Sequence, residues 1–175
     1  MTQGLHPDRL QGFAPVVAAN TRLLVLGSFP GVRSLAQQQY YGHLQNHFWK
    51  ILSALWGVDL MALPYAERCE AALAHGLGLW DVYDQCERRG SLDSAIRNAE
   101  VNDFAALKAA CPQLQAIVHN GAESFKHMPR VAASLGEGSA VAFYRLPSTS
   151  PANASWSFER KLAAWREVFE AHGVV

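Results

Sequence analysis

The chain carries the sequence LVLGSFPG at residues 24–31, where a short apolar run ends abruptly in glycine, serine, proline and glycine. Apolar runs of this length that stop at turn-forming residues are typical of buried strands. The pattern predicts a buried strand that delivers a rigid loop to the edge of a sheet. Because open α/β sheets bind their ligands at such an edge, the stretch also predicts where the site lies.

The loop after this strand carries the sequence QYYGHLQNHFW at residues 39–49. Two adjacent tyrosines, a histidine and an amide precede an aromatic pair that opens the next helix. Polar groups set among aromatic rings are more typical of a pocket than of a connector. We therefore expect a pocket that accepts a flat ligand of the size of a nucleobase.

Short apolar strands alternate with helical patterns along the rest of the chain, which favours a parallel or mostly parallel sheet covered by helices on both faces. The last helical pattern should pack into the core through its aromatic residues. Pro129 should kink or split the fourth helix. The expected strands are 22–27, 77–82, 115–120 and 140–146, and the expected helices are about 46–56, 65–75, 103–110, 121–135 and 156–172.

Length and composition predict one compact domain over residues 1–175, because this length can bury a core without disulfides. Hydrophobic residues make up 50% of the chain and charged residues 17%, which is typical of a globular protein. No apolar run is long enough to cross a bilayer, and no signal segment is recognisable. We expect a cytoplasmic monomer without membrane contact, with its three cysteines reduced.

The formal net charge of zero argues against a broad electrostatic surface for nucleic acid. It leaves room for a local one. Cations such as Arg88, Arg89 and Arg97 fall in expected loops, where they could hold phosphates together with helix N-terminal amides.

Several common catalytic motifs are missing from the sequence. It contains no Gly-x-Gly-x-x-Gly, no phosphate-binding Gly-x-x-x-x-Gly-Lys-Ser/Thr, no His-Glu-x-x-His and no Gly-x-Ser-x-Gly. Its seven histidines show no metal-ligand spacing beside a third ligand. We expect neither a metal nor a cofactor.

Three segments follow expected strands, so their side chains should meet at one edge of the sheet. They are the loop from Gly27 to Trp49, the strand end at Asn120, and the hydroxyl-rich run 146–153. Alone, Asn120 reads better as a helix cap and 146–153 as a stiff polar turn. Together, an aromatic ring, two amides and a hydroxyl loop suit a pocket that recognises a nucleobase. Since no carboxylate or nucleophile dominates, the set favours cleavage of an N-glycosidic bond by a positioned water.

These segments resemble the motifs of the uracil-DNA glycosylase superfamily, in particular its hypoxanthine-DNA (deoxyinosine) glycosylase branch. The similarity spans roughly residues 20–170, and its first motif is the specific one. The resemblance implies an α/β fold, a three-layer α/β/α sandwich around a four-stranded, mainly parallel sheet. It also implies DNA with deaminated bases as the substrate, base flipping, and hydrolysis that leaves an abasic site without metal or cofactor.

The resemblance also implies roles for individual residues. Asn46 corresponds to the catalytic asparagine of the branch, and Asn120 to the asparagine that reads the base. Ser28 stands where much of the superfamily has Asp or Asn, and Leu146 where many relatives have a histidine that stabilises the departing base. The implied base-binding residues are Gly27, Ser28, Phe29, Tyr41 and Asn120, and the implied DNA-binding and intercalation loop is Ser148, Thr149, Ser150, Pro151, Ala152 and Asn153.

Alternatives remain at this point. The same pocket could excise uracil or xanthine, because a small change in depth or in hydrogen-bonding groups separates these bases. The chain could be a non-catalytic nucleic-acid-binding module, or a hydrolase of free nucleosides. Asn46 could be only the cap of its helix.

Overall fold

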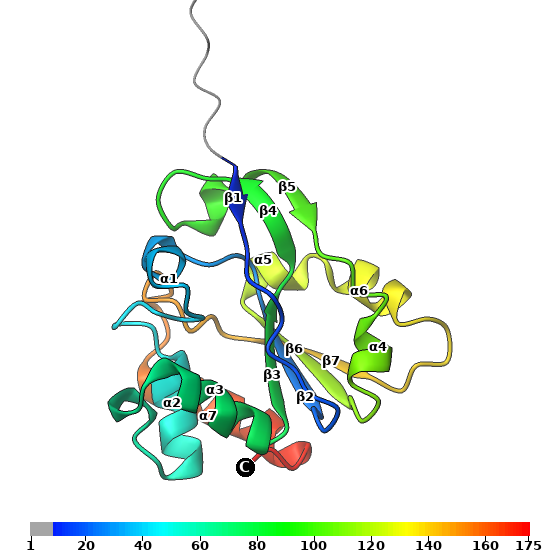
Figure 1. Ribbon diagram of the computed structural model, residues 1–175. Coiled ribbons are helices and arrows are strands. Elements are labelled where there is room, and N and C mark those ends of the chain that lie inside the picture. The colour runs from blue at the N-terminus through cyan, green and yellow to red at the C-terminus, as the bar shows by residue number, and fades with distance from the viewer. Residues whose placement is uncertain (1–8) are drawn as a thin grey trace, which may run out of the picture.

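The computed structural model describes residues 9–175, so residues 1–8 of the expected domain lie outside the described part. A four-stranded parallel sheet forms its centre, in the order β3-β2-β6-β7 (Figure 1). The four expected strands are confirmed to within a residue or two. They are β2 (Leu23–Gly27), β3 (Leu77–Asp81), β6 (Ala116–Asn120) and β7 (Ala142–Leu146).

The central strand β2 is apolar throughout because both of its faces are covered. Leu23 and Val25 point into one core, and Leu24 and Leu26 point into the other. All five β2 residues are buried. A strand that is buried on both sides needs no polar alternation, which explains the continuous run in the sequence.

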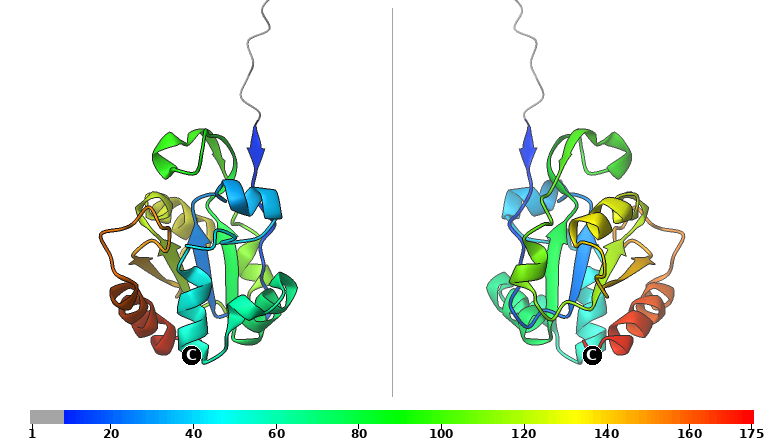
Figure 2. Two further views of the ribbon diagram at one scale, coloured as in Figure 1. Left: turned by 90° about the vertical axis from the view of Figure 1, so that its left-hand side faces the viewer. Right: turned by 90° about the vertical axis from the view of Figure 1, so that its right-hand side faces the viewer.

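Helices cover both faces of the sheet, so the α/β/α sandwich is confirmed (Figure 2). One face carries α2 (Phe48–Trp56), α3 (Tyr65–Ala74) and α7 (Phe158–Ala171). The other carries α4 (Leu107–Ala110), α5 (Ala122–Phe125) and α6 (Met128–Ser134). The helix expected at 103–110 is thus confined to its last turn.

The split at Pro129 and the aromatic face of the last helix both follow the sequence. The pattern at 121–135 divides into α5 and α6, with Pro129 in the first turn of α6, where its missing N–H costs no hydrogen bond. In α7, Trp165 and Phe169 are fully buried, and Phe158 and Leu162 pack against the same core.

A second sheet was not expected from the sequence. It is antiparallel, in the order β1-β4-β5, and lies at the top of Figure 1. Its strand β5 reads RNAEV and is largely exposed, so it shows neither an apolar run nor a clear alternation. The strands are β1 (Leu10–Gln11), β4 (Tyr83–Glu87) and β5 (Arg97–Val101), and further short helices are α1 (Val32–Gln37), η1 (Leu60–Ala62) and η2 (Asp93–Ala95).

In residues 9–175, no helix is both long and apolar enough to cross a membrane.

Candidate active site

A cavity of about 170 Å³ opens where β2, β3 and β6 end. It brings together most of the residues that the sequence singled out, from all three segments. Ala152 and Asn153 are not among its lining residues, and the Asn153 side chain instead donates to the Ser148 carbonyl at 3.1 Å. The expected site residues that line the cavity are Gly27, Ser28, Phe29, Tyr41, Asn46, Asn120, Ser148, Thr149, Ser150 and Pro151.

The cavity is smaller than the roughly 300–1,000 Å³ typical of sites for larger ligands. It therefore suits a single flat ring system. Its walls combine the aromatic rings of Phe29, Tyr40 and Tyr41 with amide, hydroxyl and carboxyl groups.

Arg88 fixes the loop that follows β2. Its guanidinium donates to the Pro30 carbonyl at 2.6 Å and to the Gly90 carbonyl at 2.7 Å, and it lies 5.3 Å from the centroid of the Phe29 ring. The side chain is buried. Arg88 was expected among the cations that could hold phosphates, and this was wrong, because the side chain is buried and its Nε and Nη2 donate to carbonyls of the protein.

Tyr41 occupies a left-handed backbone conformation, with φ of 55°. Its ring stacks on Phe48 with centroids 4.1 Å apart, and its hydroxyl accepts a hydrogen bond from the Asn120 amide at 3.3 Å. Burial raises the pKa of the hydroxyl above its usual range, so the phenol stays protonated. A non-glycine residue in this region costs on the order of 1–3 kcal/mol, a kind of strain that clusters at ligand sites.

The Asn120 side chain links the end of β6 by hydrogen bonds to residues 146–153, the hydroxyl-rich loop after β7, called the hydroxyl loop below. Its Nδ2 donates to the Thr149 hydroxyl at 3.0 Å and to Tyr41, while its Oδ1 accepts from the Thr149 backbone N–H at 3.0 Å. Both amide hydrogens are therefore used within the protein. One lone pair of Oδ1 remains for a ligand.

We predict that Asn120→Ala destabilises the protein more than Thr149→Val does. The alanine breaks all three bonds of the Asn120 amide and leaves the buried Thr149 N–H without its acceptor, which costs roughly 1–3 kcal/mol for that donor alone. Valine at 149 breaks only the bond between the Asn120 Nδ2 and the hydroxyl. Thermal melting measures the difference, at about 2–4 °C per kcal/mol for a chain of this size. Equal melting temperatures for the two variants would show that the hydrogen bonds of Asn120 to the hydroxyl loop do not add to stability in this way.

Asn46 lies at the start of α2 and lines the cavity. His47 holds the N-cap position of α2 without a side-chain bond, and Asn46, one residue earlier, accepts the Phe48 backbone N–H through its Oδ1 at 2.9 Å. The Asn46 side chain thus satisfies a donor in the first turn of the helix, which is the task of a capping residue. The cap also fixes the orientation of the amide, and a second lone pair of Oδ1 stays free for water. The capping role and a catalytic role are therefore compatible.

Two carboxyl groups that the sequence analysis did not single out also line the cavity, so the expectation of a site poor in obvious acids was wrong. Asp81 ends β3 and is only 4% exposed. Burial raises its pKa to about 7, and the repulsion of Asp93 acts in the same direction. Asp93 comes from η2 and accepts a hydrogen bond from the Ser28 hydroxyl at 2.7 Å.

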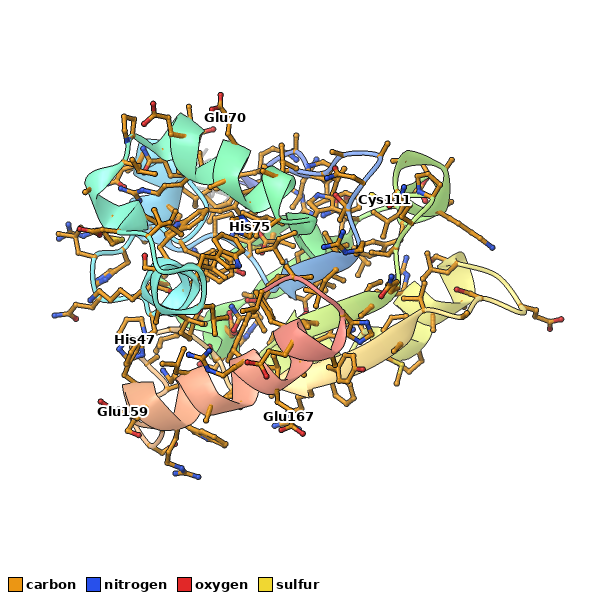
Figure 3. The ribbon with its side chains drawn as sticks, turned by 90° about the horizontal axis from the view of Figure 1, so that it is seen from below. His47, Glu70, His75, Cys111, Glu159 and Glu167 are labelled. Atoms are coloured by element: carbon orange, nitrogen blue, oxygen red, sulfur yellow. The ribbon has the colours of Figure 1, made fainter. Side chains whose placement is uncertain are left out.

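Helix α7 supports the hydroxyl loop from below. The Trp165 indole donates to the Pro147 carbonyl at 3.1 Å, and the buried Lys161 ammonium lies 3.4 Å from the Ser150 carbonyl and 3.3 Å from His47 Nδ1. Figure 3 shows His47 beside the end of α7 that carries Glu159. The loop after β7 and the start of α2 thus rest on the same helix.

Metal ligands do not gather here. In the described part of the chain, no three His, Cys, Asp or Glu side chains lie close enough together to hold an ion. The expectation that the protein works without a metal or cofactor stays a prediction.

A model of the Uracil DNA glycosylase superfamily matches residues 14–170, which is nearly the whole chain. The chain belongs to the uracil-DNA glycosylase superfamily. The match includes every segment of the cavity, from the loop after β2 to the hydroxyl loop after β7. The family that the sequence motifs resembled is thereby confirmed.

Other members of the uracil-DNA glycosylase superfamily are similar along almost their full length. A hypoxanthine DNA glycosylase of Methanosarcina barkeri is 38% identical over 91% of this chain and 98% of its own. One of Methanosarcina acetivorans is 36% identical over 91% and 97%. The solution structure of a proposed uracil DNA glycosylase from M. acetivorans is 33% identical, covers 92% of this chain and 99% of its own, and superimposes with a TM-score of 0.78.

Proposed function

We propose that the protein removes hypoxanthine from deoxyinosine in DNA by hydrolysing the N-glycosidic bond, which leaves an abasic site. One observation carries the proposal: the chain is 38% identical, over 91% of its length, to a protein named a hypoxanthine DNA glycosylase. The cavity supports it, since its size and its aromatic and amide walls suit one flat base.

In this reaction the damaged nucleotide rotates out of the duplex and its base enters the cavity. Phe29 stacks on the base. Asn46 orients the attacking water through the free lone pair of Oδ1, and the backbone groups after Gly27 face the departing base. Positioning of this kind can provide much of the rate when the transition state resembles an oxocarbenium ion.

Asn120 reads the hydrogen-bonding edge of the base in this proposal. Its donors are already bound to Thr149 and Tyr41, so only Oδ1 can serve, as an acceptor. Hypoxanthine offers an N–H donor at N1, whereas adenine has an acceptor there. Uracil and xanthine also carry an N–H donor on this edge, which keeps both bases as alternative substrates.

The loop from Ser148 to Asn153 presses on the duplex. Unstacking a base costs a few kcal/mol, which phosphate contacts and the cavity together must offset. Ala152 and Asn153 suit this role because they lie outside the cavity, on the same loop as Ser148–Pro151. Ala152 is exposed and Asn153 is half-buried.

The proposal is tested by incubating excess protein with end-labelled duplexes that each carry deoxyinosine, deoxyuridine, deoxyxanthosine or deoxyadenosine at one position. Alkali then cleaves any abasic site, and a denaturing gel measures the cut strand. We expect cleavage at deoxyinosine and none at deoxyadenosine. The uracil and xanthine lanes measure how broad the specificity is.

Two outcomes would contradict the proposal. A gel shift with the deoxyinosine duplex but no alkali-labile ends would indicate a binding module. Release of hypoxanthine from the free nucleoside, but not from the duplex, would indicate a nucleoside hydrolase.

We further propose that the protein acts as a monomer in the cytoplasm. Light scattering coupled to size exclusion tests the first point, with 19.2 kDa expected for one chain. Fractionation of cells tests the second.

A further inference from the structure

One buried acid in the cavity wall, Asp81, has no role in the proposed mechanism. Asp81 lies at the end of β3, directly opposite Gly27 in the sheet register, and lines the cavity. Its Oδ1 occupies the space where a side chain at residue 27 would begin. Its Oδ2 has no hydrogen-bond partner among the residues that the structure describes. A buried carboxyl oxygen without a hydrogen-bond partner, on a residue that lines a cavity, is costly unless another group uses it.

The surroundings favour the neutral form of this carboxyl. Burial disfavours a negative charge on it, and the neighbouring Asp93 repels one. Arg88 acts in the opposite direction; its Nη2 and Nε donate to the Pro30 and Gly90 carbonyls, and its Nη1 has no partner among the described residues. Burial dominates, and the pKa of Asp81 rises to about 7. Near neutral pH the group can therefore both hold and release a proton.

A departing purine needs such a group. When the glycosidic bond breaks, its electron pair moves onto the base, and the developing negative charge needs a donor beside it. The amides of Asn46 and Asn120 cannot give up a proton, and burial holds the proton of Tyr41. Asp81 carries the proton most readily released among these side chains.

We propose that Asp81 is the catalytic acid of this cavity, which donates a hydrogen bond to the flipped purine and transfers its proton to a ring nitrogen as the glycosidic bond breaks. The step rests on the proposed function. The base leaves as a neutral molecule and Asp81 becomes a carboxylate. The attacking water gives its oxygen to the sugar carbon, and the proton that it loses restores the acid, so charge and atoms balance.

The proposal is tested by measuring single-turnover excision rates on a deoxyinosine duplex between about pH 5.5 and about pH 9. This range extends to both sides of the pKa of Asp81. The wild-type rate should fall about tenfold per pH unit above the pKa of the acid, because only the protonated form reacts. Asp81→Asn keeps the shape and a donor but no transferable proton. It should be slower by about 100-fold or more near pH 6, and flat above that pH.

Two further variants sharpen the assignment. Asp93→Asn removes the charge that disfavours ionisation of Asp81, so the falling limb of the profile should move to lower pH. Glu167→Gln removes one carboxylate from the outer face of α7 (Figure 3), and its profile should match that of the wild type.

Several results would contradict the assignment of Asp81 as the catalytic acid. An active wild type with a flat profile would do so while the proposed function stands, and so would Asp81→Asn with the wild-type rate. Loss of the pH-dependent limb in Asp93→Asn, with the limb intact in Asp81→Asn, would move the role to Asp93. A wild type inactive on deoxyinosine at every pH would overturn the proposed function itself.

Asp81→Asn should also change how stability depends on pH. This measurement checks that the pKa of Asp81 is raised in the folded wild-type protein. A group whose folded pKa is raised stabilises the protein fully below its unfolded value, here 3.8, and loses this contribution as pH rises to about 7. The variant, which cannot ionise, should therefore melt at least about 3 °C above the wild type at alkaline pH. At acidic pH the difference should shrink, and a constant difference would contradict the raised pKa.

Discussion

Replacing Asn46 by alanine is expected to slow hypoxanthine excision by about 100- to 1,000-fold, the usual loss when a positioned polar group is removed from a site of this kind. The carboxamide lines the cavity and is oriented by its bond to the Phe48 N–H. Its loss removes both the acceptor that holds the water and the cap of α2. Single-turnover excision, normalised to folded protein, measures the catalytic part of the effect.

The capping contribution is separated by Ser157→Ala. Ser157 caps α7 by accepting the Arg160 N–H at 3.2 Å, and it is not among the residues that line the cavity. Both variants should lose roughly 1 kcal/mol of stability, since each loses the side-chain acceptor of one N–H in the first turn of a helix. Only Asn46→Ala should lose activity. If the two variants excise hypoxanthine at similar rates, Asn46 is a helix cap and nothing more.

Gly27→Ala is expected to abolish excision and to destabilise the fold. A methyl group at this position would meet the Asp81 carboxyl and would lie 3.1 Å from the Tyr41 hydroxyl. Asp81 is buried and Tyr41 is half-buried and stacked on Phe48, so neither can withdraw freely, and overpacking of this kind costs roughly 1–3 kcal/mol. Because displacing a reacting group by about 1 Å can cost 100-fold in rate, the excision rate should fall at least that far.

Gly31→Ala is the matched comparison for stability, since it adds the same methyl group to the same loop. There the methyl group would meet only the Ser91 side chain, at ordinary contact distances of 3.4 and 3.6 Å. Its melting temperature should stay within about 3 °C of the wild type, and Gly27→Ala should melt lower. A Gly27→Ala variant with the melting temperature and excision rate of the wild type would show that Asp81 and Tyr41 can move aside at little cost.

Strands β2, β3 and β6 could be predicted because they are almost entirely buried and consist mainly of apolar residues. The edge strand β7 is largely half-buried, and its apolar residues around Arg145 were enough to mark it. The antiparallel sheet could not be predicted. In β5 the residues Arg97–Val101 are mostly exposed and their pairing with β4 is interrupted by register shifts, so no periodic signal marks the strand. The inward turn of Arg88 depends on this sheet and was hidden with it.

The site shows the same division. Residues at or just after the ends of the expected strands, such as Ser28 and Asn120, do meet at one edge. Asp81 could have been found by the same rule, because it lies at the end of the expected strand 77–82. Asp93 could not, since it reaches the cavity from a hairpin whose strands carry no clear pattern.

The parallel order of the sheet also bears on how the enzyme comes into being. Leu23 of β2 pairs with Leu77 and with Ala116, partners that are far away along the chain, and the loop that closes the cavity follows the last strand. Sheets built from such distant pairings form slowly, because chain entropy must be lost before the contacts are gained. A chain in which β7 has not yet joined the sheet therefore lacks a complete cavity and should not excise bases from DNA. In a refolding experiment, recovered excision reports the moment at which the last strand joins.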